Sequence, residues 1–188
     1  TLKIVEKYKD KISKILSEKD KGLYDALNKG IDMATGDVVG ILHSDDFYID
    51  SEVIQKYVSV FESRKVDSVY SDLYYVDKTD TNKIIRKWKS GEYSETSFIN
   101  GWMPPHPTFY ARRAIYQRLG GFDLDYQIAA DYDCLLRFLS VGQITSIGFD
   151  VVNPSGTTLI GYSIRMGATG ASALTSTWEG GLTSVWGP

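Results

Sequence analysis

Apolar residues in the first part of the chain follow helical and strand spacing in turn. Residues 1–10 and 22–34 carry apolar side chains every three or four positions, so both are predicted helices, the second closed by Gly36. Between them, residues 12–17 fit a short strand. The continuous apolar run 37–42 is typical of a strand that is buried on both faces.

The succession of helix and strand patterns continues to about residue 140. Inward-facing apolar residues predict a helix over 51–64 and another over 128–139, the latter burying Ile128, Tyr132, Leu135, Leu136 and Leu139. The other predicted elements are a strand at 67–77, a turn at 77–82, a hairpin strand at 83–89, a rigid proline-rich loop at 103–107 and a helix at 112–119. This order predicts an α/β sheet that is parallel in its first half.

Residues 151–188 have a different composition from the rest of the chain. They hold two charged side chains, Arg165 and Glu179, and seven glycines, without a sustained apolar period. We therefore predict a folded domain over 1–150 and a tail rich in Gly, Ser and Thr over 151–188, to which no helix or strand is assigned.

Composition limits the class of protein. Hydrophobic residues make up 43% of the 188 residues and charged residues 24%, as in ordinary soluble globular domains. The net charge of −3 gives no broad attraction for nucleic acid or anionic lipid, so no nucleic-acid partner is expected. The single cysteine, Cys134, lies in an apolar stretch where we expect burial, and it favours a reducing compartment. No apolar run reaches the roughly 20 residues of a membrane span.

A pair of carboxylates follows the apolar strand predicted at 37–42. Ser44, Asp45 and Asp46 come directly after it, and ligands of open α/β sheets bind beyond the carboxyl ends of strands. Two neighbouring carboxylates suit Mg²⁺ or Mn²⁺, which keep positions open for phosphate oxygens. A solvated turn or a helix cap explains the same residues without any chemistry.

A second pair of carboxylates opens the helix predicted at 128–139. Successive helix residues are about 100° apart, so Asp131 and Asp133 are expected to point in different directions, one toward a cleft and the other toward solvent or a basic neighbour. The helix N-terminus stabilises the ionised form, which leaves Asp131 able to accept a proton. Capping of the first turn, with no catalytic role, is the alternative.

Two histidines and a short polar segment complete the candidate chemistry. His106 lies between prolines and either orients an acceptor sugar or phosphate, or holds its loop through a structural hydrogen bond. His43 is expected to support the neighbouring carboxylates. Lys21, beside Asp20, and Lys29 either meet a diphosphate or are exposed charges at a helix start, and Asn28 is expected to brace the loop there.

Several spaced motifs occur together, and their order is informative. They are EKDKGLYDALNKGI at 18–31, ATGD at 34–37, LHSDD at 42–46, WMPPHPTFYARR at 102–113, GGFD at 120–123, and ADYD at 130–133 followed by LLR at 135–137. In this order they closely resemble the family 2 glycosyltransferases, and the resemblance covers roughly residues 1–148.

The resemblance implies a fold and a reaction class. The fold is the α/β, GT-A type of nucleotide-diphospho-sugar transferase, in which helices flank a mixed and mostly parallel central sheet. The reaction is an inverting single displacement that uses a divalent cation, Mn²⁺ or Mg²⁺, and a nucleotide-sugar donor. A UDP-sugar is the expected donor.

The same resemblance implies roles for individual residues. Ser44-Asp45-Asp46 matches the metal and nucleotide motif, with Asp46 as the main metal ligand and Asp45 nearer the ribose or diphosphate. Asp131 matches the general base that takes the proton of the acceptor hydroxyl. The remaining assignments are Asp20, Lys21 and Asn28 to the nucleotide, and His106 and Trp102 to the acceptor side.

Three features depart from the family pattern. Ala130 stands where an acidic residue usually precedes the catalytic Asp, so the acceptor contacts are expected to differ. The first family strand and its loop, which form much of the nucleoside pocket, would precede Thr1, so we expect a chain truncated at its N-terminus whose own activity is left open. Residues 151–188 do not follow the pattern expected after the last core strand.

The expected function is therefore that of a hexosyltransferase-like enzyme moving a sugar from a nucleotide-sugar to a saccharide or lipid-linked acceptor. By analogy with the family, it would build a bacterial surface polysaccharide from the cytoplasm, and peripheral association with the inner face of the cytoplasmic membrane is left open. Two alternatives stay open as well. One is a sugar-phosphate nucleotidyltransferase of similar fold, and the other is a non-catalytic fragment that binds nucleotide or carbohydrate.

Overall fold

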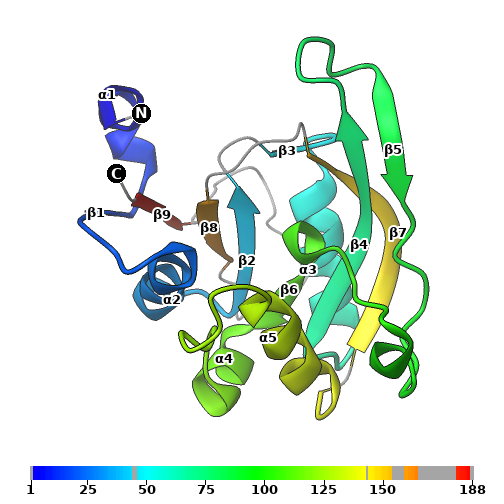
Figure 1. The fold of residues 1–188 in the computed structure, drawn as a ribbon. Helices are drawn as coiled ribbons and strands as arrows, with labels where there is room; N and C mark the ends of the chain where they lie inside the picture. The colour runs from blue at the N-terminus through cyan, green and yellow to red at the C-terminus, as the bar shows by residue number, and fades with distance from the viewer. Residues whose placement is uncertain (1, 44–45, 143, 154–158, 165–180, 187–188) are drawn as a thin grey trace.

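The computed structural model describes residues 2–43, 46–142, 144–153, 159–164 and 181–186, and side chains are described up to residue 142. The described strands form one sheet. Helices cover both of its faces, with α3 (Val53–Ser63) behind the sheet in Figure 1 and α2 (Leu23–Met33), α4 (Arg113–Leu119) and α5 (Ala130–Leu139) in front of it. The fold is therefore of the α/β class that the sequence predicts.

The remaining elements alternate with these helices along the chain. Helical segments are α1 (Leu2–Lys7) and the short 3-10 turns η1 (Lys9–Lys11), η2 (Phe98–Asn100) and η3 (His106–Thr108). Strands are β1 (Lys14–Ser17), β2 (Val38–His43), β3 (Phe47–Tyr48), β4 (Ser68–Val76), β5 (Ile84–Trp88), β6 (Tyr110–Arg112), β7 (Ile144–Asn153), β8 (Leu159–Ile164) and β9 (Gly181–Trp186).

The sheet is mixed, but the expectation of mostly parallel pairing is wrong. Its order is β1-β9-β8-β2-β6-β4-β7-β3, with β5 paired to β4. Of the eight pairs between described strands, six are antiparallel and two, β1 with β9 and β4 with β7, are parallel. The reason is β6, which follows the proline-rich loop and lies between β2 and β4, antiparallel to both. β2 and β4 still point the same way, as predicted, without being neighbours.

The predicted helices and strands before residue 140 are all present, with differences at their ends. Helix α2 ends at Met33 because Ala34 is extended, and Gly36 does not adopt the left-handed conformation expected of a closing glycine. Ile128 precedes α5 and is 84% exposed, and Leu136 is 41% exposed, so both were wrongly expected to face inward. The buried face of α5 is shifted by one position, toward Cys134 and Phe138.

The structure contains strands beyond residue 150, where the sequence analysis assigned none. β7 continues through this position to Asn153 and pairs in parallel with β4. β8 lies antiparallel to β2, and β9 joins β8 to β1. β8 carries apolar residues at the alternate positions Ile160, Tyr162 and Ile164, a signal that the sequence analysis missed within a segment rich in Gly, Ser and Thr.

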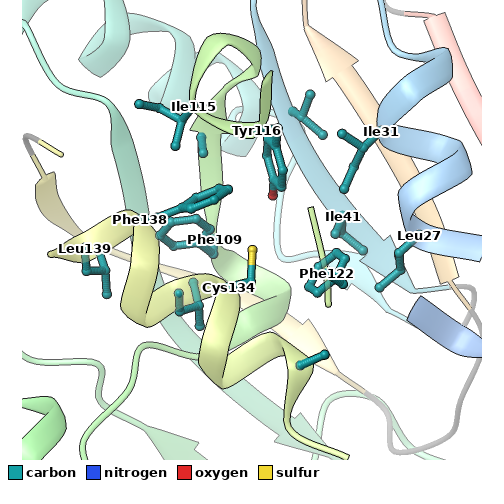
Figure 2. Packing of buried hydrophobic residues seen from close by; sticks show 14 of the residues in the cluster. Leu27, Ile31, Ile41, Phe109, Ile115, Tyr116, Phe122, Cys134, Phe138 and Leu139 are labelled. Carbon is teal, nitrogen blue, oxygen red and sulfur yellow. The ribbon is translucent and has the colours of Figure 1, made fainter. Parts of the chain in front are cut away.

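Apolar residues of successive strand positions enter different clusters, as the alternation of side chains along a strand requires. Val39 and Ile41 of β2 belong to the cluster covered by α2, α4 and α5, which Figure 2 shows. Val38 belongs to the cluster beneath α3. Cys134 is buried in the first cluster, and burial raises the pKa of its thiol to about 12, so it behaves as a packed apolar residue, as predicted.

Candidate active site

The carboxyl end of β2 carries the first candidate group. Asp46 is 8% exposed, and its backbone N–H donates to the carbonyl oxygen of His43 at 3.0 Å. This turn places Asp46 directly beyond the strand, where open α/β sheets bind ligands. Ser44 and Asp45, the other members of the predicted metal and nucleotide motif, lie outside the described residues.

Two histidines lie together beside this strand end. The ring centroids of His43 and His106 are 6.4 Å apart. Burial, reinforced by His106, lowers the pKa of His43 to about 4, although the charge of Asp131 acts in the opposite direction. Burial likewise lowers the pKa of His106, again opposed by Asp131. Both imidazoles are therefore neutral at pH 7 and able to hydrogen-bond a sugar hydroxyl without adding charge.

The two carboxylates of helix α5 point in different directions, as the sequence predicts. Asp131 accepts a hydrogen bond from the hydroxyl of Tyr24 at 3.3 Å, and its charge reaches both histidines. Asp133 instead accepts from Nε of Arg137, one turn along the helix, at 2.9 Å. Asp131 is therefore the acidic residue of this helix that belongs to the site, and Asp133 has a structural partner.

Helix α5 begins abruptly, which places Asp131 in its first turn. Ala129 has a φ of 69°, and it is the one non-glycine residue with positive φ in the part of the chain that the structure describes. Such a conformation is unfavourable for an alanine and is found most often at functional sites. The backbone of this first turn, at Ala130 and Asp131, also hydrogen-bonds the hydroxyl of Tyr24.

A network of buried hydrogen bonds fixes the turn that carries His106. The hydroxyl of Thr108 donates to the carbonyl oxygens of Ser71 and Pro105, each at 2.8 Å. The hydroxyl of Tyr57 donates to the carbonyl oxygen of Thr108 at 2.6 Å. These contacts join η3 to β4 and α3, so the rigid loop predicted from its prolines is held by side chains as well.

Asn28 lies at the boundary between the site and the core. Its amide donates to the carbonyl oxygen of Phe122 at 2.7 Å and accepts from the N–H of the same residue at 2.8 Å. Both polar groups of this backbone position are thus satisfied by one side chain. Asn28 therefore braces the segment at Phe122 rather than the loop at residues 20–22 where bracing was expected, and its contact with a nucleotide stays a prediction.

Replacing Asn28 with alanine is expected to lower the free energy of unfolding by about 1–3 kcal/mol, because the partly buried N–H and C=O of Phe122 lose their partners. Urea unfolding measures the change. Asn100→Ala is the matched control, since the exposed amide of Asn100 makes one bond, to Thr96. An Asn28→Ala protein within about 0.5 kcal/mol of the original would contradict the bracing role.

Asp20 and Lys21 form the start of helix α2. The Asp20 carboxylate accepts from the N–H of Gly22 at 2.9 Å, and the N–H of Lys21 donates to Asp25 at 2.9 Å. Gly22 has a φ of 129°, which side-chain-bearing residues rarely adopt. This geometry agrees with the helix-start interpretation of the two residues. Their assignment to a diphosphate stays a prediction.

Trp102 is part of an aromatic cluster. Its indole N–H donates to the carbonyl oxygen of Ser90 at 2.6 Å. Its ring lies 5.8–5.9 Å from those of Tyr70, Tyr93 and Phe98. Tyr132 of α5 joins the cluster by packing on Phe98. Trp102 therefore supports the segment around η2, and its contact with an acceptor stays a prediction.

The donor atoms at the strand end fit one type of cation better than another. Within the described ranges, no group of three or more His, Cys, Asp or Glu side chains is placed to hold a metal ion. Asp46 offers a hard carboxylate oxygen, the kind of ligand that Mg²⁺ and Mn²⁺ prefer. A Mg²⁺ or Mn²⁺ ion held by one or two carboxylates and completed by phosphate oxygens suits such a donor set.

The sequence analysis did not single out Tyr24 or Phe122 as members of the site. Tyr24 stacks on Phe122 with ring centroids 5.5 Å apart, and the edge of Phe122 meets His106 at the same separation. Tyr24 and Asn28 are four residues apart, so they share one face of α2. This spacing could have indicated that Tyr24 and Asn28 contact the same part of the protein. It does not show which distant segment they contact.

Comparisons with known proteins find a matching family profile and several relatives. The family profile described as Glycosyl transferase family 2 matches residues 1–123. An uncharacterized glycosyltransferase of Mycobacterium tuberculosis is 31% identical over 122 residues, which cover 64% of this chain and 45% of the relative. A PGL/p-HBAD biosynthesis glycosyltransferase of Mycobacterium bovis is 29% identical over the same shares. An uncharacterized glycosyltransferase of Methanocaldococcus jannaschii is 22% identical over 144 residues, 73% of this chain and 49% of the relative.

The chain spans just under half the length of these curated relatives. The family match covers β1, β2, β4 and β6 and ends at Asp123, before Asp131. None of the helices in the described ranges is long and apolar enough to cross a bilayer.

Proposed function

Because this chain belongs to glycosyl transferase family 2 and therefore has a GT-A-type fold, we propose that the whole protein transfers a sugar from a nucleotide-sugar to a saccharide or lipid-linked acceptor. One observation carries the proposal. Asp131 interacts electrostatically with His43 and His106, whose rings lie 6.4 Å apart near the carboxyl end of β2, where Asp46 follows. This arrangement supports Asp131 as the proposed proton acceptor and Asp46 as the proposed cation ligand.

In the proposed reaction, Asp131 removes the proton of an acceptor hydroxyl as its oxygen attacks the anomeric carbon. The new carbon–oxygen bond forms while the bond to the nucleoside diphosphate breaks on the opposite side, so the configuration inverts. The proton ends on the carboxylate of Asp131, and the bonding pair leaves with the diphosphate. The neutral imidazoles of His43 and His106 orient the sugar by hydrogen bonds.

We assign the cation to Asp46, with Asp45 as its neighbour. A bound Mn²⁺ or Mg²⁺ would neutralise the charge that develops on the departing diphosphate. Asp46 is buried at the strand end, where water competes less for the carboxylate than at an open surface.

The acceptor class is proposed from a relative. The protein of Mycobacterium bovis bears a name that refers to PGL/p-HBAD biosynthesis. By extension, we propose a lipid-linked or saccharide acceptor of the cell envelope for this protein, which would act in the cytoplasm at the membrane face. A UDP-sugar is the proposed donor.

Binding of free nucleotides tests the proposal against the nucleotidyltransferase alternative. Calorimetric titration of the protein with UDP, GDP, dTDP and UTP is expected to give binding of one diphosphate, tightened about tenfold, or 1.4 kcal/mol, by Mn²⁺. Tighter binding of the triphosphate than of any diphosphate, or a diphosphate affinity that Mn²⁺ leaves unchanged, would contradict the proposed donor site.

A further inference from the structure

We infer that Tyr24 is a positioning residue for the carboxylate of Asp131, holding one oxygen so that the other faces the acceptor. The inference rests on the proposed function for the role of Asp131, and on the structure for the contact. The Tyr24 hydroxyl donates to Oδ1 of Asp131 at 3.3 Å, across 107 positions of sequence. Tyr24 itself is placed to touch the carboxylate, not the reacting sugar.

The phenol of Tyr24 is suited to a permanent donor role. Burial, together with the nearby charge of Asp131, raises the pKa of Tyr24. The hydroxyl therefore keeps its proton throughout the neutral range. A donor that never titrates there can hold a carboxylate without competing with it for the proton.

The ring of Tyr24 is held in place independently of Asp131. It stacks on Phe122 with an interplanar angle of 25°. The backbone of Phe122 is gripped by both polar ends of the Asn28 amide, which comes from the next turn of the same helix. Helix α2 therefore fixes both the stacking partner and the hydroxyl.

Helix α5 is tied to the same segment from the other side. Arg137 donates to the carbonyl oxygens of Leu119 and Gly121, at 2.5 and 2.6 Å, and pairs with Asp133. The connection between α4 and α5 is thus attached to α2 through Phe122 and to α5 through Arg137. The bond from Tyr24 to Asp131 completes a closed set of contacts among these three elements.

Tyr24 is the titratable side chain that donates a hydrogen bond to the Asp131 carboxylate among the described residues. The other titratable groups that interact with this carboxylate are His43 from β2, His106 from η3 and Cys134 of α5 itself. On α5 itself, Asp133 and Arg137 pair with each other. Loss of the Tyr24 hydroxyl is therefore expected to remove a hydrogen bond that fixes the orientation of the Asp131 carboxylate.

The contact is tested first without any activity measurement. The 188-residue chain is labelled with 3-fluorotyrosine, and Tyr24→Phe identifies the Tyr24 signal among the 13 tyrosines in ¹⁹F spectra. In the Asp131→Asn chain, this signal is expected to titrate at lower pH than in the original chain, because a neighbouring negative charge is gone. An unchanged titration would overturn the contact.

The positioning role is tested next by a double-mutant cycle on the whole protein. Tyr24→Phe keeps the stacked ring and is expected to lower kcat about three- to tenfold, with the donor KM unchanged. In the Asp131→Asn background, the same change is expected to have no further effect. Tyr132→Phe is the matched control, since its hydroxyl donates to the carbonyl oxygen of Phe98.

The outcomes separate the two claims. Full activity of Asp131→Asn would contradict the proposed base, whatever the ¹⁹F result. An inactive Asp131→Asn, combined with a Tyr24→Phe enzyme that keeps its kcat, would overturn the positioning role alone. Equal losses from Tyr24→Phe in both backgrounds would also overturn it, because the effect would not pass through Asp131.

Discussion

Replacement of Asp131 by asparagine is expected to lower sugar transfer about a hundred- to ten-thousandfold, the range typical of a lost general base. The amide keeps the size of the carboxylate and accepts the Tyr24 hydrogen bond through its oxygen, but it cannot take a proton from the acceptor. Binding of the nucleotide is expected to stay within about twofold, since Asp46 is untouched. Steady-state transfer rates and calorimetric binding of the nucleoside diphosphate measure both quantities.

Asp133→Asn provides the matched control for this change. It removes the neighbouring carboxylate of the same helix, which pairs with Arg137 at 2.9 Å. Arg137 keeps its bonds to the carbonyl oxygens of Leu119 and Gly121, so the fold and the transfer rate are expected to be retained. Turnover of Asp131→Asn at the rate of the original protein would remove Asp131 as the base.

The second large effect is expected at Asp46. Asp46→Ala removes a buried carboxylate at the end of β2 and is expected to abolish the Mn²⁺ dependence of nucleotide binding and to lower transfer at least about a hundredfold. The physical reason is the charge of the leaving diphosphate, which would lose its proposed counter-ion. Titration of Mn²⁺ against the nucleotide affinity measures the change.

Asp50→Ala is the control for Asp46→Ala. Asp50 lies four residues further along, is exposed, and pairs with Lys56 at 3.1 Å. Its replacement is expected to leave the Mn²⁺ dependence unchanged. A variant Asp46→Ala that still binds nucleotide more tightly with Mn²⁺ than without it would refute the assignment of the cation to this residue.

Individual helices and strands were predictable from the sequence because their buried positions carry apolar residues at regular spacing. The helix predicted at 51–64 is present as α3, which buries Val53, Tyr57 and Phe61, and β2 is buried along most of its length. The pairing of strands in the sheet was harder to predict from the sequence. The short β6 of three residues follows the proline-rich loop, and nothing in its own sequence shows that it lies between β2 and β4.

The sequence allowed individual candidate residues of the site to be identified from their residue type and spacing. The opposite directions of Asp131 and Asp133 follow from helix geometry, and the structure confirms them. The partnership of Tyr24 with Asp131 depends on the packing of α2 against the segment around Phe122, a long-range contact. A short sequence pattern does not predict a contact between residues that lie so far apart along the chain. The inward positions of α5 were misjudged because the helix begins after Ala129, so Ile128 falls outside it.

The most direct test of the central claim is release of nucleoside diphosphate by the whole protein from a panel of UDP-, GDP- and dTDP-sugars, with an envelope lipid extract as the source of acceptor. The assay compares the original protein with Asp46→Ala and Asp131→Asn, each with and without Mn²⁺. We expect one donor to be consumed in a Mn²⁺-dependent way, with the sugar recovered on an acceptor and both variants inactive. Metal-independent release that is equal in all three proteins, with no sugar transferred, would contradict the account.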